Sequence, residues 1–235
     1  MQKYIKFAKP AIVILENVTT FAGPANRKPF LDLIQFLESC GYSTQHKVLC
    51  TSDFGIPQNR RRVYIVAIQK RLVRLPFAWP KPIGHIPLSK MWDRDRRGII
   101  VKSTKIPEDV IAGKTTFDNL QSTFKKLKKM KLVPSQTDCI LDLGASSRFA
   151  TFKINMAPTL TASRCASQMY YSTKQMRKLS LSELMRLQGC DPKRFNTSGL
   201  TKTQLGSIIG NAMSVNVMEA VIEKAIKTIG GISKL

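Results

Sequence analysis

Long apolar runs are missing from this sequence of 235 residues. Its longest purely aliphatic run, Ala11 to Leu15, is far shorter than the ~20 residues that a membrane-spanning helix needs. The segment 1–10 has no apolar core of signal-peptide length and is typical of the end of an amphipathic helix. We therefore expect neither a membrane span nor a signal peptide.

Clustered metal ligands are missing as well. The sequence has two histidines and no Cys-x-x-Cys pair, which argues against a zinc site, and we expect no metal. An odd number of cysteines at irregular spacing indicates reduced thiols in a cytoplasmic or nuclear compartment, each more typical of a small core residue than of a nucleophile. The five are Cys40, Cys50, Cys139, Cys165 and Cys190.

Acidic residues are scarce: 15 Asp and Glu stand against 38 Lys and Arg, a formal net charge of +23. A folded chain this basic favours a polyanionic partner, most often nucleic acid. The alternative is a basic soluble protein without that function, such as a ribosome-associated one. A hydrophobic content of 43% is globular, and the length allows one large domain or two small ones.

Apolar periodicity predicts an α/β arrangement in the first part of the chain. The continuous apolar runs at 11–15 and 63–68 are typical of strands buried on both faces, as in a parallel sheet. A helix is predicted over 29–40, closed by Gly41, and a further strand near 44–50. Together these elements indicate one edge of an α/β sheet.

Prolines and basic residues dominate the middle of the chain. From Phe117 to Lys131 the pattern turns helical, with apolar residues on one face and lysines mainly elsewhere. That lysine face is either simply solvated or a phosphate contact. Later, the spacing of Ser180 and Glu183 predicts a capping box that opens a helix ending at Gly189, and a last helix is predicted over 214–229.

Three segments carry residues suited to chemistry. Glu16-Asn17-Val18 follows the first strand at its carboxyl end, where open α/β sheets bind ligands. Arg60 and Arg62 enter the strand 63–68, and strand alternation predicts that they share a face and need an anionic or carbonyl-rich partner. Gly210-Asn211 is predicted to open the last helix and to offer backbone N–H groups to a polar ligand. Each segment alone also fits a structural role, as a helix cap or a salt-bridged turn.

In this order, the segments resemble the C-terminal part of the cytosine-5 DNA methyltransferases. Glu16-Asn17-Val18 resembles the sixth conserved motif of that family, and 55–62, Gly-Ile-Pro-Gln-Asn-Arg-Arg-Arg, resembles the eighth. Residues 157–163 with 177–189 resemble the ninth, and 210–217 the tenth. The basic segment between the eighth and ninth motifs has the position of the variable target recognition domain.

The resemblance implies the fold and the domain ranges. The fold class is α/β: the C-terminal half of a Rossmann-like methyltransferase sheet plus a mixed, mainly β target recognition domain. The expected ranges are 1–70 and 205–235 for a partial catalytic domain and 71–204 for the target recognition domain. Double-stranded DNA is the expected partner, with one cytosine flipped out of the duplex.

The resemblance also implies roles for individual residues. Glu16 would hydrogen-bond the N3 edge of the flipped cytosine, Arg62 would bind its O2, and Gln58 and Arg60 would brace the site. Asn211 and Ala212 would touch S-adenosyl-L-methionine, most of whose pocket lies outside this chain. The expected DNA contacts are Arg61, Lys125, Lys126, Lys128, Lys129 and Arg164.

Three family features are absent from the sequence, one of them the acidic residue that binds the cofactor ribose. There is no Phe-x-Gly-x-Gly cofactor loop, and none of the cysteines stands in a Pro-Cys-Gln. We therefore expect the chain alone to be inactive and a complementary N-terminal methyltransferase subunit to supply the cofactor loop and the nucleophile. The alternatives are an inactive truncated enzyme, a non-catalytic DNA-binding or regulatory relative, and a fragment of a tRNA cytosine-5 methyltransferase.

Overall fold

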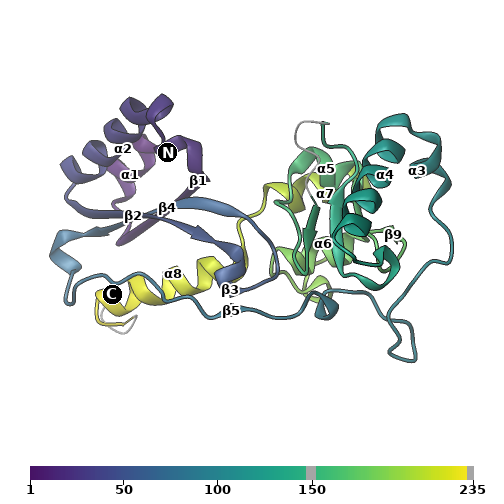
Figure 1. Cartoon of the computed structure of the whole chain (residues 1–235). Coiled ribbons are helices and arrows are strands. Elements are labelled where there is room, and N and C mark those ends of the chain that lie inside the picture. Colours follow the sequence, from purple (N-terminus) through teal and green to yellow (C-terminus); the bar gives the residue numbers. More distant parts are fainter. Residues whose placement is uncertain (147–151, 232–235) are drawn as a thin grey trace. The chain divides into compact units, whose positions relative to one another are not determined.

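A computed structural model of the chain describes residues 1–146 and 152–231 (Figure 1). The chain forms two compact units. Unit 1 comprises Met1–Phe54, Arg61–Ile83 and Asn216–Leu235, and unit 2 comprises Gly55–Arg60 and Gly84–Val215. These boundaries differ from the predicted domain ranges, because 71–83 belongs to unit 1, whereas 55–60 and all of 205–215 belong to unit 2.

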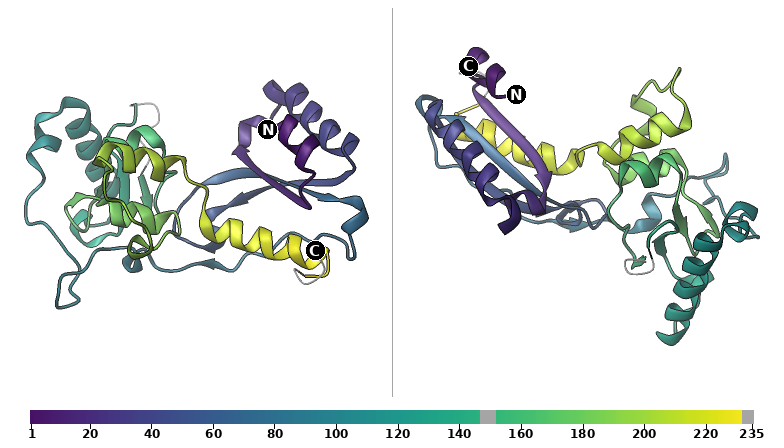
Figure 2. Two further views of the ribbon diagram at one scale, coloured as in Figure 1. Left: turned by 180° about the vertical axis from the view of Figure 1, so that it is seen from behind. Right: turned by 90° about the horizontal axis from the view of Figure 1, so that it is seen from above.

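Unit 1 is built around a three-stranded sheet in the order β1-β4-β2. Its helices lie on both faces, with α2 on one side and α8 on the other (Figures 1 and 2). The elements are α1 (Gln2–Ala8), β1 (Ile12–Val18), α2 (Arg27–Ser39), β2 (Tyr42–Cys50), β4 (Arg61–Gln69) and α8 (Val215–Thr228). Where the chain passes between the units in sequence, the short strands β3 (Phe54–Gly55) and β5 (Gly84–His85) form a two-stranded sheet.

The central strand β4 explains why its sequence is continuously apolar. Its odd positions, such as Val63 and Ile65, pack with α2, while its even positions, such as Tyr64 and Val66, pack with Val217 and Val221 of α8. Burial on both faces is therefore confirmed for β4. The expectation of parallel pairing is wrong, because β1 and β2 both pair with β4 in antiparallel register.

Unit 2 contains an antiparallel sheet in the order β7-β6-β8-β9. Ile140 and Tyr170 face a core shared with α6, and their neighbours Leu141 and Tyr171 face a second core shared with Leu120 of α4. The elements are α3 (Glu108–Ala112), α4 (Lys114–Lys129), β6 (Cys139–Asp142), β7 (Phe152–Ile154), α5 (Ala162–Ala166), β8 (Tyr170–Ser172), β9 (Arg177–Lys178), α6 (Leu181–Leu187) and α7 (Lys202–Asn211).

The structure confirms the helix start that was predicted at Ser180 in unit 2. The Ser180 hydroxyl accepts the Glu183 N–H while the Glu183 carboxylate accepts the Ser180 N–H, so the predicted capping box is confirmed. Glu183 is fully buried. Its carboxylate also accepts hydrogen bonds from both terminal nitrogens of Arg177, at 2.6 and 2.8 Å, and from the N–H of Asp93. These hydrogen bonds raise the pKa of the Arg177 guanidinium.

Within the residues described, no single helix is long and apolar enough to cross a membrane; α7 and α8 meet that criterion only when taken together, by length and composition. All five cysteines are free thiols. Burial raises the pKa of Cys139 and of Cys165 to about 12, which makes both unreactive as thiolates near neutral pH.

Candidate functional site

Glu16 and Arg62 meet across neighbouring strands of unit 1. In the β1–β4 register Val18 lies opposite Arg62, and Glu16 lies opposite Tyr64. Residues two apart in a strand share a face, so Glu16 and Arg62 are diagonal neighbours on the same face, within reach of long side chains. Arg62 Nε lies 3.1 Å from Glu16 Oε1, and the two side chains are only 14% and 12% exposed.

This ion pair offers complementary groups at one place. The Arg62 guanidinium is held further by donation from Nη1 to the carbonyl of Arg61, at 2.9 Å. A carboxyl group recognises ring nitrogens and exocyclic amines, whereas a guanidinium recognises carbonyl oxygens. The pair therefore has the donors and acceptors needed to bind the polar edge of a pyrimidine.

Gln58 and Arg60 have a different environment, inside unit 2. Arg60 is 3% exposed and donates from Nη1 to the carbonyl of Leu160, at 2.7 Å, and from Nη2 to the carbonyl of Ala212, at 3.0 Å. The partner types expected of the two arginines are thus both found: carbonyls for Arg60 and a carboxylate for Arg62. Arg60 precedes β4, however, so strand alternation does not govern its direction.

The Gln58 side chain is fully buried and continues the same set of contacts. Its Nε2 donates to the carbonyl of Leu187, and its Oε1 accepts the Leu160 N–H at 3.3 Å. Gln188 was not predicted as a site residue, yet it is also fully buried and links Gln58 to the carbonyl of Ile209. The signal in the sequence was its position within 177–189, the segment that resembles the ninth motif.

The predicted position of Asn211 in the secondary structure needs a correction. Asn211 does not open the last helix: it is the final residue of α7, and α8 begins at Val215. The first-turn N–H groups expected there are therefore not available to a ligand, and the Ala212 carbonyl already accepts from Arg60. Contact of Asn211 and Ala212 with S-adenosyl-L-methionine stays a prediction, and we derive no step through that molecule.

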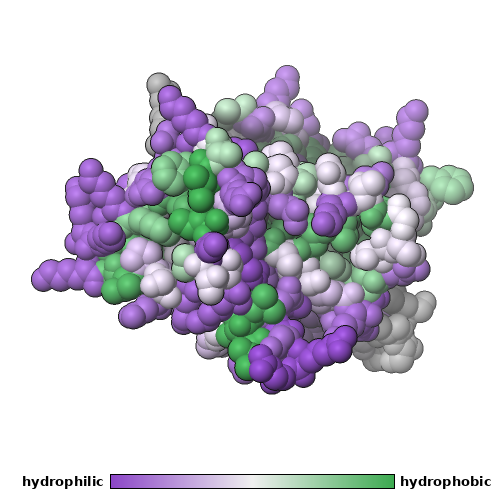
Figure 3. All heavy atoms as spheres, turned by 90° about the vertical axis from the view of Figure 1, so that its right-hand side faces the viewer, coloured by the Kyte–Doolittle hydropathy of each residue, from purple (hydrophilic) through white to green (hydrophobic). Residues whose placement is uncertain are grey.

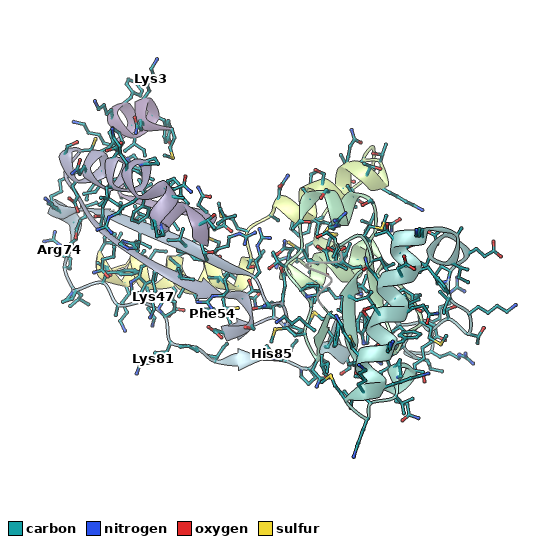
Figure 4. The ribbon with its side chains drawn as sticks, turned by 45° about the horizontal axis from the view of Figure 1, so that its top comes forward. Lys3, Lys47, Phe54, Arg74, Lys81 and His85 are labelled. Atoms are coloured by element: carbon teal, nitrogen blue, oxygen red, sulfur yellow. The ribbon has the colours of Figure 1, made fainter. Side chains whose placement is uncertain are left out.

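Unit 1 contains a cavity with a different set of lining residues. It has a volume of about 560 Å³, and its lining includes Phe54, Trp79 and Asn216 but neither Asn211 nor Ala212. Figure 4 marks Phe54 at this position on β3. None of the predicted site residues lines this cavity.

Most of the predicted DNA contacts are exposed basic side chains. α4 buries Leu120 and Leu127 and leaves its lysines outside. Lys125, Lys128 and Lys129 line an open hollow with Phe124, and Lys126 and Arg61 are also exposed. Hydrophilic residues cover much of the face of unit 2 seen in Figure 3.

Arg164 differs from these lysines because it already has an anionic partner. Its Nε lies 3.2 Å from Asp142 Oδ2. Burial raises the pKa of the Asp142 carboxyl, and the nearby Arg164 charge opposes that shift. A phosphate at Arg164 would have to share its guanidinium with this carboxylate.

The C-5 cytosine-specific DNA methylase family matches residues 1–227, so the chain belongs to this family. The type II methyltransferase M.NgoBI of Neisseria gonorrhoeae is 30% identical over 218 residues, covering 92% of this chain and 61% of the relative. M.HaeII of Haemophilus aegyptius is 29% identical over 230 residues, covering 97% of this chain and 65% of the relative. The chain thus spans less than two thirds of the length of these relatives.

Solved structures support the fold. A putative DNA modification methyltransferase encoded within a prophage of E. coli superimposes with a TM-score of 0.59 at 18% identity, covering 97% of this chain and 72% of that structure. The Entamoeba histolytica methyltransferase EhMeth superimposes with a TM-score of 0.55 at 18% identity, covering 93% of this chain and 63% of that structure. Mixed α/β architecture with methyltransferase neighbours is therefore confirmed.

Proposed function

We propose that this chain is the base-binding and DNA-recognising part of a cytosine-5 DNA methyltransferase that uses S-adenosyl-L-methionine. The Glu16–Arg62 pair is the observation that carries the proposal, since it joins the two motifs whose roles concern the flipped base. Unit 1 would then be the C-terminal half of the methyltransferase sheet. Unit 2 would be the target recognition part; more of its described residues lie in helices than in strands, so the expectation of a mainly β domain is wrong.

In this proposal the two side chains divide the polar edge of cytosine between them. Glu16 hydrogen-bonds N3 and the exocyclic amine, while Arg62 donates to O2 and stabilises charge that develops on the ring. Both groups sit in a partly shielded place, where such hydrogen bonds are stronger than in water. Gln58 and Arg60 act indirectly, by holding the backbone of unit 2 together.

The nucleophile and the cofactor loop would come from polypeptide outside this sequence, in a complementary N-terminal subunit. Support for this comes from the missing Pro-Cys-Gln and from the share of each relative that the chain spans. Among the described strands, β1 is also at an edge of its sheet, with β4 as its neighbour on one side. An edge strand with apolar residues is suited to pairing with another strand.

The test is co-expression with the neighbouring reading frame, chosen for its Pro-Cys-Gln, followed by measurement of labelled methyl transfer to duplex DNA. We expect transfer by the pair and none by either part. Glu16→Gln and Arg62→Ala abolish it, whereas the matched variants Glu223→Gln and Arg74→Ala, at exposed positions, keep it. Full activity of Glu16→Gln, or an inactive wild-type pair, contradicts the proposal.

DNA binding by the chain alone is a separate readout. A double Lys125→Ala, Lys128→Ala variant should lower the slope of log affinity against log salt by roughly two, because each phosphate contact contributes about 0.9. Fluorescence anisotropy with a labelled duplex gives this slope. Tight binding without methyl transfer, even with the partner present, would instead support a regulatory DNA-binding protein.

A further inference from the structure

A tight hairpin in unit 2, residues 94–100, carries three arginines; we call it the arginine turn. The Asp95 N–H donates to the carbonyl of Ile99 at 2.8 Å, and the Gly98 N–H donates to the carbonyl of Asp95 at 2.9 Å. Arg94 pairs with Ile100 across the hairpin. Gly98 has φ +79, the left-handed conformation that closes such a turn without strain.

The Asp95 carboxylate holds the tip of the arginine turn in place through hydrogen bonds within the turn. Its Oδ1 accepts the N–H groups of Arg97 and Ile99, each at 2.9 Å, and its Oδ2 lies 3.3 Å from Arg97 Nη2. The Ile99 N–H and then the Arg97 contacts lower the pKa of Asp95, so it stays ionised. The turn is thus held by its own hydrogen bonds and needs no packing over its tip.

The base of the arginine turn is anchored in the core of unit 2. Trp92 is buried, and its Nε1 donates to Asp138 at 3.3 Å. The Asp93 carboxylate bonds to Ser180 and Arg186, and its N–H donates to the buried Glu183 at 2.8 Å. A flexible surface loop would lose much more entropy on binding than this braced hairpin.

The tip presents two guanidinium groups and an apolar side chain. Arg97 is ion-paired with Asp95 but its side chain remains 79% exposed. Arg96 is exposed and has no ion pair within the described residues, and Ile99 is 56% exposed. One acid among three arginines leaves the turn positively charged.

We propose that the arginine turn enters the major groove of duplex DNA and that Arg96 reads a guanine there. This rests on the proposed function and names residues that set its sequence specificity. The major groove admits a two-stranded ribbon, and a guanidinium bonds to O6 and N7 of guanine in a bidentate way. Ile99 gives the same tip an apolar contact for a thymine methyl group. The α4 lysines, by contrast, lie on a helix face suited to phosphates.

The experiment selects binders from a pool of duplexes with a randomised centre, using the full chain. Wild type, Arg96→Ala, Arg96→Lys and the control Arg74→Ala are compared; Arg74 is an exposed arginine in unit 1 (Figure 4). Affinities are then measured for the enriched sequence and for single base-pair changes of it. Circular dichroism melts check that each variant folds.

We expect Arg96→Ala to reduce the preference for one enriched guanine by roughly 5- to 150-fold, the range for one bidentate contact. Arg96→Lys keeps the charge and should keep the salt slope, yet lose most of that preference, because an ammonium lacks the planar fork. Arg74→Ala should match wild type in preference.

Other outcomes overturn the proposal. If Arg96→Ala weakens all sequences equally and lowers the salt slope by about one, Arg96 contacts phosphate instead. If it behaves as Arg74→Ala does, or if a structured RNA binds more tightly than any duplex, the arginine turn is not a groove reader of DNA. If wild type binds no duplex, the proposed function itself fails, a result distinct from loss of preference in Arg96→Ala alone.

Discussion

Replacing Arg60 should make unit 2 easier to unfold, even though substitutions of arginine usually change the free energy of unfolding only slightly. Arg60→Ala removes two well-formed hydrogen bonds, to Leu160 at 2.7 Å and Ala212 at 3.0 Å, and a longer one to Gly210 at 3.4 Å. Each bond from a charged donor contributes about 1.5–3 kcal/mol, and the Leu160 and Gly210 carbonyls left behind are buried. Relief of the cost of burying a charge offsets part of this loss. We expect a net decrease of about 3 kcal/mol in the free energy of unfolding, a large share of the ~5–15 kcal/mol of a typical domain.

The assay is urea unfolding followed by tryptophan fluorescence. The chain has two tryptophans, and Trp79→Phe leaves Trp92 as the reporter of unit 2. Arg61→Ala is the matched control, since it removes the same charge from an exposed neighbouring position and should change the free energy by less than about 0.5 kcal/mol. If Arg60→Ala is no more destabilising than Arg61→Ala, the bracing role is refuted.

Two further predictions concern the packing and the titration of unit 2. A Cβ at Gly210 would collide with the backbone of Thr161, so Gly210→Ala should cost about 1–3 kcal/mol, whereas Ser207→Ala on the same helix should not; thermal melts of both variants compare them. Folding holds the pKa of Cys139 and Cys165 at about 12, above the ~8.5 of an unfolded thiol, so the folded state keeps protons that the unfolded state releases. The stability that these thiols contribute should therefore be fully present below about pH 8.5 and decline as the pH rises toward 12. Urea midpoints at pH 8 and pH 10 measure this decline. If the midpoint of a double Cys139→Ala, Cys165→Ala variant declines as much as that of the wild type, the reasoning is contradicted.

Periodicity was enough to predict burial but not strand direction. The alternating contacts of Val63 and Tyr64 with opposite helices follow directly from an apolar run, because both faces of the strand are covered. Whether neighbouring strands run parallel or antiparallel depends on which distant segments pair, and no local pattern encodes that. The antiparallel pairing matters for the site, since it is the register that brings Glu16 diagonally across from Arg62.

The glycine at 210 explains why the start of the last helix was predicted wrongly. A glycine before a polar residue suits a helix boundary, but it also suits close packing between helices. Gly206 and Gly210 serve the second purpose, because each places α7 directly against the backbone of α5. Gln188 was missed for a related reason: its partner Gln58 lies far away in the sequence, and a buried amide leaves no spacing signal.

Arg60 and Arg62 lie two residues apart in the sequence, yet the proposed function gives Arg60 a structural role and Arg62 a role in base binding. The chain leaves unit 2 at Arg60 and enters unit 1 at Arg61, so Arg60 and Arg62 contribute to different units. Loss of methyl transfer in variants of either residue would therefore have different causes. Arg62→Ala should remove activity while the urea midpoint reported by Trp92 stays unchanged, since the only ion pair shown for Arg62 in the described residues is with Glu16 of unit 1. Arg60→Ala should lower that midpoint first, and any loss of activity should follow the unfolded fraction.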